Sequence, residues 1–543
     1  MPLMTTGQAI VESLLAHGVD TVFGIPGAHT YDLFDALHAA GDRIRFITTR
    51  HEQAGGYLAY GYAKSSGKVG VFSVVPGPGV LNAGAAMCTA LGACTPILCL
   101  TAEIPAPFIG RGRGILHELP NQLATLQGIN KWAARIDHPS EACAAVATAF
   151  RKMREGRPGP AALETPWNVL GQRAEIALGP PLSLQPPMCV DPDSIRQAAE
   201  IIRAAKNPMI MVGAGALHAG AEVLRLAQLL QAPVVAHRSG RGIVSEALPY
   251  GFSGGSAIHL WMNTDVVIGI GSRLELQHLR WKTMPANVKF VRIDIDPLEM
   301  VRLPPAAGVV ADARAGTAAL VEALMKKIGP RPSREHEFIR AKAKARGEFE
   351  KVQPQMSYLD AIRAVLPHDG FFVEEISQVG FAARFGFPVY APRTYVTCGY
   401  QETLGFGFNT ALGVKVANPD KPVISICGDG GFLFGAQELA TAVQHGINVI
   451  TCVFNNSAFG NVRRDQLTTY KGRIIGAELA NPDFVKLAES FGVAAYRVRT
   501  PAEFRPVLER AFAADAPALI EVMVERGSEA SPWPFLHPAF EAR

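Results

Sequence analysis

The chain has 543 residues, with 52 Lys and Arg against 48 Asp and Glu, so its net charge is +4. A charge this small for the length does not point to a nucleic-acid or membrane-surface partner. No apolar run reaches the roughly 18 residues of a membrane span, and the start lacks the flanks of a signal peptide, so we expect a cytoplasmic protein. The length exceeds what one core can organise and predicts about three domains.

Residues 1–172 alternate short apolar runs with helical patterns. Predicted strands lie at 21–23, 44–48, 69–75 and 96–101. Glycine-rich turns or helical patterns follow most of these strands. This alternation is typical of a doubly wound α/β domain with a parallel sheet.

The rest of the chain repeats this alternation twice. A proline-rich stretch at 171–192 predicts a linker, and a charged stretch at 329–355 with a helical middle predicts a second connection. We place a central Rossmann-like domain at 190–328, a third α/β domain at 356–530 and a proline-rich C-terminal tail at 531–543. The predicted strands of these two domains lie at 208–212, 266–270, 290–295, 423–427, 447–454 and 518–524. The predicted fold is therefore α/β, with three doubly wound parallel-sheet domains.

The most informative stretch connects two of these strands. The strand at 423–427 leads into Gly428-Asp429-Gly430-Gly431, and the strand at 447–454 ends on Asn455-Asn456. The carboxyl ends of strands in a βαβ unit lie side by side, so we expect Asp429 and Asn456 to meet. Bare backbone at a helix start suits a phosphate, and carboxylate and amide oxygens suit Mg²⁺. A lone GDG is equally well explained as a βα turn with a capping Asp, but GDG followed by NN is more specific.

Motifs spread over all three domains resemble one enzyme family. They are FGIPG at 23–27, RHEQAGGYLAYGYAKSSGK at 50–68, GPG at 77–79 with Asn82, KW at 131–132, IDID at 293–296, LGFGFNTALGVKVANP at 404–419 and the GDG…NN pattern. Together they resemble thiamine-diphosphate (ThDP) enzymes of the acetolactate synthase-like group. The resemblance implies that 1–172, 190–328 and 356–530 are the pyrimidine-binding, central and diphosphate-binding domains.

The resemblance gives Glu52 the central catalytic role. Taken alone, a Glu near a helix start is most simply a cap or a partner of the helix dipole. In the family, a glutamic acid shares a proton with N1′ of the cofactor's aminopyrimidine, which then removes the proton from C2 of the thiazolium ring. Such a residue needs a dry pocket, which burial supplies. The cofactor carries the difficult chemistry while the protein orients it.

The resemblance also implies a set of cofactor contacts. The metal ligands would be the side chains of Asp429 and Asn456 and the backbone carbonyl of Ala458. The further candidates for cofactor binding are Pro26, Gly27, Asn82, Ser377, Gln378, Gly428, Gly430, Gly431, Phe459 and Gly460. Leu404 falls where a bulky apolar residue bends the cofactor into a V shape, although core packing is the simpler explanation. The carbonyl of Glu402 would receive a hydrogen of the 4′-amino group, and relatives often have glycine at this position.

Two histidines are candidates on the substrate side. His29 follows the FGIPG turn, and His117 falls in a loop that the family places near the reacting carbon. A lone histidine is more often a satisfied structural group, and that alternative stays open for both.

The central domain departs from the flavin-binding acetolactate synthases. Those relatives carry a glycine–methionine–histidine segment and an arginine–phenylalanine–aspartate segment, where this chain has GFSG at 251–254 and GSRLE at 271–275. The GAG at 213–215, with Asp294 and Asp296, is weak evidence for a nucleotide. FAD is therefore not predicted, and an FAD site, an ADP-like site and an empty site all stay open.

The function that the resemblance implies is ThDP- and Mg²⁺-dependent cleavage or formation of the C–C bond next to the carbonyl of a 2-oxoacid. The leading hypothesis is decarboxylation with carboligation to an aldehyde or ketoacid. The alternatives are a simple 2-oxoacid decarboxylase, an oxalyl-CoA decarboxylase-like acyl-CoA lyase, a 1,2-diketone hydrolase, a flavin-containing pyruvate oxidase and a catalytically silent regulatory paralogue. Biosynthetic acetolactate synthases carry a tryptophan after the NN strand that is missing from 458–466, which argues against acetolactate synthesis itself.

The resemblance further implies an assembly. In this fold Glu52 and Asp429 of one active site come from different chains, so a homodimer is the minimal active unit and a homotetramer is expected. The expected partners are small molecules, with no nucleic acid and no membrane.

Overall fold

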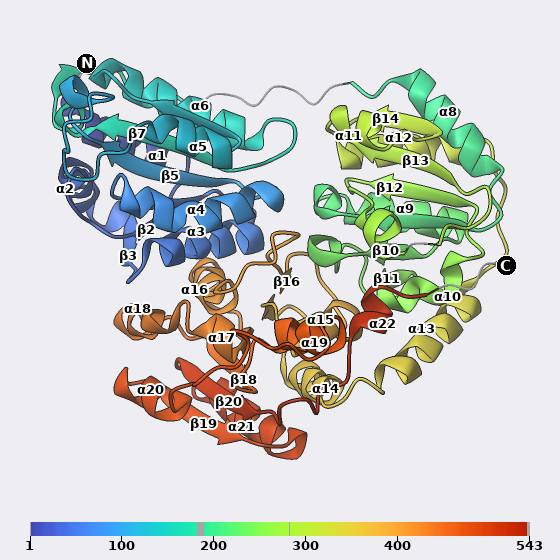
Figure 1. Cartoon of the computed structure of the whole chain (residues 1–543). Coiled ribbons are helices and arrows are strands. Elements are labelled where there is room, and N and C mark those ends of the chain that lie inside the picture. Colours follow the sequence, from blue (N-terminus) through green and yellow to red (C-terminus); the bar gives the residue numbers. More distant parts are fainter. Residues whose placement is uncertain (1, 182–188, 282, 540–543) are drawn as a thin grey trace.

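The computed structural model describes residues 2–181, 189–281 and 283–539. Residues 182–188 of the predicted linker and 540–543 of the predicted tail therefore lie outside the described residues. The three predicted α/β blocks appear as three groups of helices and strands, with the first and central blocks side by side above the third (Figure 1). Three six-stranded parallel sheets confirm the predicted fold class.

The first block is a parallel sheet with helices on both sides. Its strands are β2 (Thr21–Gly24), β3 (Arg45–Thr48), β4 (Gly70–Val74), β5 (Ile97–Glu103), β6 (Trp132–Arg135) and β7 (Ala161–Pro166), in the order β3-β2-β4-β5-β7-β6. Its helices are α1 (Thr6–Ala16), α2 (Tyr31–Ala39), α3 (Glu52–Ser66), α4 (Pro78–Gly92), α5 (Gln122–Ile129), α6 (Ala142–Arg154) and α7 (Trp167–Leu170). A short antiparallel pair, β1 (Leu3–Thr5) with β8 (Arg173–Glu175), joins the two ends of this block.

The third block repeats the topology of the first. Its strands are β15 (Phe371–Glu374), β16 (Tyr395–Val396), β17 (Val423–Gly428), β18 (Ile450–Asn455), β19 (Ala494–Val498) and β20 (Ala518–Met523), in the order β16-β15-β17-β18-β20-β19. Its helices are α14 (Gln355–Val365), α15 (Gln378–Gly386), α16 (Gly407–Ala417), α17 (Asp429–Phe432), α18 (Leu439–His445), α19 (Gly460–Thr468), α20 (Phe484–Ser490), α21 (Pro501–Ala513) and α22 (Trp533–Leu536). Numbered within each block, both sheets have the strand order 2-1-3-4-6-5.

The central block has a different strand order. Its strands are β9 (Pro208–Val212), β10 (Val234–Ala236), β11 (Gly251–Ser253), β12 (Val266–Ile270), β13 (Lys289–Asp294) and β14 (Ala307–Val310), in the order β11-β10-β9-β12-β13-β14. Its helices are α8 (Pro192–Arg203), α9 (Gly220–Leu230), α10 (Ile258–Trp261), α11 (Leu298–Arg302) and α12 (Ala313–Met325), and α13 (Glu335–Phe349) leads to the third block. Numbered within the block, the order is 3-2-1-4-5-6, that of dinucleotide-binding sheets.

The first and third blocks share one apolar core, which is built around the crossing of α3 and α16. A glycine on each helix permits the close approach. A Cβ added at Gly61 would lie 2.1 Å from the carbonyl oxygen of Thr410, and one added at Gly413 would lie 1.9 Å from that of Leu58. Both distances are far below van der Waals contact, so the crossing requires glycine on both helices. This crossing ties the first and third blocks of one chain together.

One prediction about secondary structure is wrong. The sequence after the GDG turn has a helical pattern that predicts a single helix before the strand at 447–454, whereas α17 ends at Phe432 and α18 begins at Leu439. Gly435 lies in the break, where an added Cβ would meet the side-chain amide of Asn409 at 2.4 Å. The close approach of Asn409 thus fixes an irregular segment that helical periodicity in the sequence does not reveal. Within the described ranges, no helix has both the length and the apolar character needed to span a membrane.

Candidate active site

The two parts of the GDG…NN motif follow the carboxyl ends of β17 and β18, which lie side by side in the sheet. The strands are parallel neighbours, with Gly428 paired to Phe454. Asn481 connects them, because its Nδ2 donates to Asp429 Oδ2 at 2.7 Å and to Asn455 Oδ1 at 2.9 Å. Sequence reasoning missed Asn481, which stands in a loop outside the motif. A carboxylate and amide groups therefore meet at one edge of the sheet.

Asp429 is a buried carboxylate that suits a cation. It is 2 % exposed, and its hydrogen-bond donors, the Asn481 amide and the backbone N–H groups of Gly430, Ser457 and Ala458, are all neutral. Burial raises the pKa of Asp429, since desolvation outweighs these hydrogen bonds. A divalent cation would offset the cost of burying the charge, and Mg²⁺ prefers carboxylate oxygens. The donor set therefore fits the predicted metal.

A residue beyond β20, Glu529, orients the second predicted metal ligand. Asn456 Nδ2 donates to Glu529 Oε2 at 2.9 Å, while Asn456 Oδ1 accepts from the backbone N–H of Ala458 at 3.1 Å. Burial raises the pKa of Glu529 to about 7. Sequence reasoning missed Glu529, since 73 residues separate it from Asn456 and no motif contains it. Such an outer partner decides which atom of the amide faces the metal.

The glycines of the GDG turn leave no side chains over the backbone where the sequence predicts a diphosphate. A Cβ added at Gly431 would lie 2.7 Å from a carboxylate oxygen of Glu375, and one added at Gly428 would lie 3.6 Å from the Cβ of Ser377. Ser377 caps α15, accepting from the backbone N–H of Gly380 at 3.0 Å, and Gln378 is the first residue of that helix. The start of α15 and the GDG turn thus adjoin. Free N–H groups at a helix start suit an anion.

Phe459 and Gly460 form the other side of this turn. A Cβ added at Gly430 would lie 2.4 Å from the ring of Phe459, and one added at Gly460 would lie 2.9 Å from Asn456 Nδ2. Ala458 is buried and its neighbour Phe459 is half-buried. These contacts place the predicted residues 456–460 against the GDG turn, so the diphosphate and metal candidates form one contiguous group.

Glu52 forms a second group in the first block. It is the first residue of α3, and the preceding His51 caps the helix by accepting from the backbone N–H of Gln53 at 3.2 Å. Asn82 Nδ2 donates to Glu52 Oε2 at 3.0 Å, which pairs two predicted cofactor residues. The predicted dry pocket is not complete within one chain, because Glu52 is half-buried and Asn82 is exposed. Pro26 is exposed and Gly27 half-buried in the turn after β2.

The third block holds the turn that precedes Glu52. The backbone N–H of Arg50 donates to both carboxylate oxygens of Glu438, at 3.0 and 3.1 Å. Thr441 Oγ1 donates to the same carboxylate at 2.6 Å. Glu438 is fully buried, and burial raises its pKa to about 7. Sequence reasoning missed this contact, because a Glu at the start of a helix gives no sign of a partner 388 residues away.

Loop 399–405 carries the two residues predicted to contact the cofactor's pyrimidine. Leu404 is half-buried, and its contact with a cofactor stays a prediction. Glu402 has a φ of 47°, in the left-handed region that favours glycine. Its side chain accepts from Arg384 Nη1 at 2.8 Å and from Arg238 Nη2 at 2.9 Å. Neither arginine belongs to a sequence motif, and both were missed.

The two candidate histidines lie together. The ring centroids of His29 and His117 are 5.5 Å apart, and His29 Nε2 is 2.9 Å from the carbonyl oxygen of Leu116. Their Nδ1 atoms are buried and have no hydrogen-bond partner among the residues that the structure describes. Burial lowers the pKa of His117, and the nearby His29 lowers it further. An added Cβ at Gly77 would lie 2.5 Å from the His117 carbonyl, so the pair borders the GPG turn, and its catalytic role stays a prediction.

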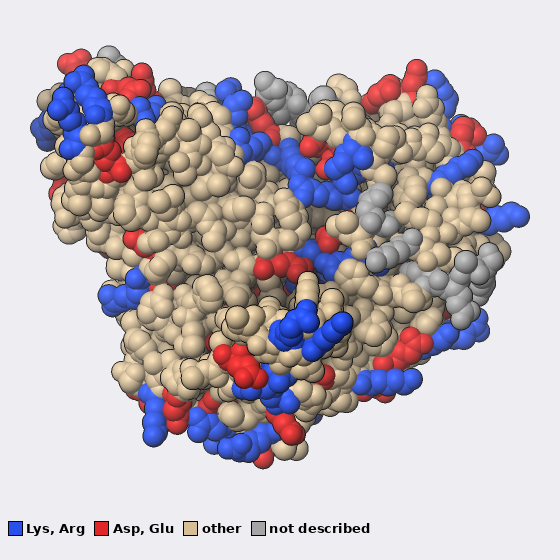
Figure 2. All heavy atoms as spheres, viewed as in Figure 1, with Lys and Arg blue, Asp and Glu red and all other residues tan. Residues whose placement is uncertain are grey.

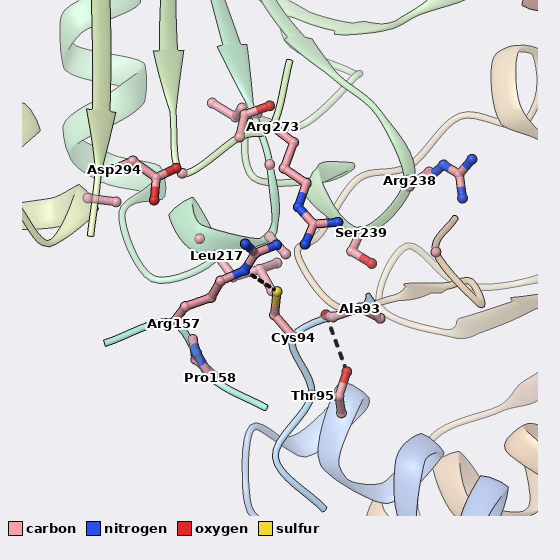
Figure 3. A pocket seen from close by; sticks show the side chains of 18 of the residues that line it. Ala93, Cys94, Thr95, Arg157, Pro158, Leu217, Arg238, Ser239, Arg273 and Asp294 are labelled. Atoms are coloured by element: carbon pink, nitrogen blue, oxygen red, sulfur yellow. Dashed lines mark hydrogen bonds between the residues drawn. The ribbon is translucent and has the colours of Figure 1, made fainter. Parts of the chain in front are cut away.

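A cavity of about 460 Å³ lies where the first and central blocks meet, and Arg393, Gly399 and Tyr400 of the third block also line it. It lies at the carboxyl ends of β9 and β12, where the strand order reverses and where sheets of this topology bind nucleotides. Arg157 and Cys94 come from the first block, Arg273 and Asp294 from the central block (Figure 3). Arg157 Nε donates to Cys94 Sγ at 3.1 Å. The cavity agrees with the GAG turn at 213–215 without distinguishing FAD from an ADP-like ligand.

The two groups of candidate residues lie on α/β blocks of the same topology, an arrangement that agrees with an enzyme that binds ThDP, also called thiamine pyrophosphate (TPP). The chain belongs to the thiamine pyrophosphate enzyme family. Residues 4–125 match its N-terminal TPP binding domain, residues 195–322 its central domain and residues 375–522 its C-terminal TPP binding domain. The chain is thus a ThDP-dependent carboligase or decarboxylase of the acetolactate synthase-like group.

Similar proteins match over nearly their whole length. The chain is 32% identical to a probable 2-ketoarginine decarboxylase of Pseudomonas aeruginosa over 527 residues, 96% of this chain and 94% of that protein. It is 33% identical to a probable acetolactate synthase large subunit of Methanocaldococcus jannaschii, over 96% of this chain and 92% of that protein. The acetolactate synthase large subunit of Haemophilus influenzae is 31% identical, over 94% of this chain and 93% of that protein.

Proposed function

We propose that this enzyme uses ThDP and Mg²⁺ to cleave the C–C bond next to the carbonyl of a 2-oxoacid and to transfer the remaining acyl unit to an aldehyde or ketoacid. The observation that supports this proposal most is the conjunction of two pairs of residues on blocks of identical topology. Asn82 donates a hydrogen bond to Glu52, while Asp429 and Asn456 follow the ends of the neighbouring strands β17 and β18. Each pair sits at the carboxyl edge of its sheet, where ligands of open α/β sheets bind.

The residues would divide the work as follows. Asp429, Asn456 and the carbonyl of Ala458 would hold Mg²⁺, and the bare turn at 428–431 would hold the diphosphate. Glu52, kept in place by Asn82, would hold a proton at its carboxyl group and exchange it with the cofactor's pyrimidine. Bound ThDP would supply the carbon that adds to the substrate carbonyl and the ring that accepts the electrons left when CO₂ departs.

A second copy of the chain would complete the site. Glu52 and Asn82 are incompletely covered, and the surrounding surface carries exposed apolar side chains, namely Leu81, Leu433, Phe434 and Val443. Figure 2 shows few charged side chains over this part of the first and third blocks. Apolar surface of this kind favours a protein interface. We infer a homodimer that brings Glu52 of one chain to Asp429 of the other, and a homotetramer built from such dimers.

Simple decarboxylation is the second candidate. It is favoured by the likeness to a probable 2-ketoarginine decarboxylase and by the missing tryptophan after β18. In this case a proton, rather than an aldehyde or ketoacid, would take the place of CO₂. The two reactions begin with the same bond cleavage and differ only in the acceptor, so the residues named above would act identically in both.

A panel of 2-oxoacids, supplied with and without aldehyde acceptors and analysed by mass spectrometry, distinguishes the two candidates. Carboligation predicts products that contain the acceptor, and simple decarboxylation predicts aldehydes alone. Lack of turnover of every 2-oxoacid by protein that binds ThDP would contradict both. An absorbance spectrum of the purified protein tests the central cavity separately, because bound flavin gives a visible absorption band.

A further inference from the structure

Loop 399–405 joins β16 to α16 and has an unusual backbone. It begins at Gly399, with a φ of 67°, and ends at Gly405, with a φ of 76°. Glu402 inside the loop has a φ of 47°, a region that residues with a side chain seldom adopt. Strained residues of this kind persist only when their surroundings hold them in place. The contacts of Glu402 therefore identify what shapes the loop.

Arginines from two blocks share one oxygen of Glu402. Arg384 Nη1, on α15 of the third block, donates to Glu402 Oε1 at 2.8 Å. Arg238 Nη2, just after β10 of the central block, donates to the same oxygen at 2.9 Å, and Arg280 Nη2 is 3.5 Å away. The side chains of these arginines are at most 10 % exposed, whereas that of Glu402 is 29 % exposed. The carboxylate thus connects the cofactor-facing loop to the central block.

The central end of this connection is also constrained. Arg238 has a φ of 50°, so both partners of the ion pair adopt the left-handed backbone region. Arg238 Nη2 donates a second hydrogen bond, to Glu275 Oε1 at 2.9 Å. Burial would raise the pKa of Glu402, but Arg384 and Arg238 outweigh it and lower the pKa. The pair is therefore ionised at neutral pH and held at both ends.

Stability alone is a weak explanation for such a network. A buried ion pair often contributes no more to stability than apolar residues of the same volume, because both charges lose their hydration. Three atoms of the network, Arg238 Nη1, Arg280 Nε and Arg384 Nη2, are buried and have no hydrogen-bond partner within the described ranges. Incomplete hydrogen bonding makes the network costlier still. The network therefore contributes mainly by fixing the positions of its residues rather than by stabilising the fold.

We propose that Arg238 and Glu402 form an interdomain lock, which holds loop 399–405 in the shape that places Leu404 and the carbonyl of Glu402 against the cofactor's pyrimidine. Both are positioning residues, because they act through the loop. The inference rests on the proposed function for its effect on catalysis, since the shape of the loop matters to turnover only when ThDP binds against it. The lock makes the central block part of the catalytic machinery even when its own cavity holds no ligand.

The test uses the full-length chain with ThDP and Mg²⁺ and compares E402Q, R238M and the double variant with wild type. E337Q is the matched control, because Glu337 lies on α13 and forms an ion pair with Arg334, which directly precedes that helix. Hydrogen exchange of the peptide that covers 399–405 is measured with and without ThDP. The near-ultraviolet circular dichroism of bound ThDP and the kcat and KM for the accepted 2-oxoacid are measured in parallel.

If the lock exists, hydrogen exchange at 399–405 should be faster in both single variants than in wild type, and the circular dichroism band of bound ThDP should change. The kcat should fall by about 10-fold or more, while KM changes by less than about 3-fold. The double variant should be no worse than E402Q, because E402Q already removes the contact between Arg238 and the carboxylate of the loop. Exchange and dichroism indistinguishable from those of E337Q would overturn the lock. A wild-type chain that fails to bind ThDP would overturn the proposed function instead, and exchange without ThDP would still decide whether the lock exists.

Discussion

The backbone N–H of Arg50 donates to both carboxylate oxygens of Glu438, although the two residues belong to different blocks and lie 388 positions apart in the chain. Arg50 lies two residues before Glu52, and Glu438 immediately precedes α18. The third block thus sets the position of the helix start that carries the predicted catalytic acid. The relation between Arg50 and Glu438 connects the two cofactor-facing blocks within one chain.

The E438Q variant tests this contact through pH dependence. Burial raises the pKa of Glu438 to about 7, so between its ordinary value of 4.5 and about 7 the folded chain keeps a proton that the unfolded chain has lost. The folded state then loses stability as pH rises through this window, by about 3 kcal/mol in all. Glutamine imitates the protonated acid. The thermal midpoint of E438Q relative to that of wild type should therefore be higher at pH 8 than at pH 5. An equal difference at the two pH values would contradict a raised pKa of Glu438.

The D429A variant tests the cation site. Removal of the buried carboxylate takes away the predicted anionic metal ligand, so binding of Mg²⁺ together with ThDP should weaken by about 100-fold or more. Isothermal titration of ThDP at saturating Mg²⁺ measures the loss. The D420A variant, at an exposed aspartate before β17, is the matched control and should bind as wild type does. Equal affinity in D429A and D420A would remove Asp429 from the site.

The E529Q variant tests the partner of Asn456. Asn456 Nδ2 donates to Glu529, which leaves Asn456 Oδ1 as the atom available to a metal. Glutamine can present its own amide nitrogen to Asn456 and so disturb this orientation. We expect the affinity for Mg²⁺ in the presence of ThDP to fall by about 10-fold, the lower end of the effect of outer-shell residues. An affinity equal to that of wild type would show that Asn456 is oriented without Glu529.

The G413A variant tests the crossing of α3 and α16. Its added Cβ would lie 1.9 Å from the carbonyl oxygen of Leu58, so the helices must separate and thermal stability should fall by about 1–3 kcal/mol or more. The control is G128A in α5, where no atom lies within 4 Å of an added Cβ. G128A should leave the thermal midpoint unchanged or raise it slightly. Equal midpoints for the two variants would refute the close crossing.

The sequence predicts the sheets well because buried parallel strands are continuous apolar runs, and the run at 208–212 coincides with β9. It also places Asp429 and Asn456 at the ends of neighbouring strands, as β17 and β18 are, and their shared metal site stays a prediction. It does not predict the break between α17 and α18, because the approach of Asn409 to Gly435 is a tertiary contact. Glu438, Glu529 and Arg238 were missed for the same reason, as each acts on a site residue that is remote in sequence.

The assembly of the active site is the central claim, and subunit complementation tests it most directly. E52Q and D429A are each expected to be inactive, and E52Q should still bind ThDP. When the two variants are co-expressed, a hybrid dimer whose sites combine Glu52 of one chain with Asp429 of the other contains one intact site. Random pairing in a two-fold dimer should then restore about a quarter of wild-type turnover of the 2-oxoacid. No restored activity in verified hybrid dimers would contradict the shared site and place Glu52 and Asp429 of one active site in the same chain.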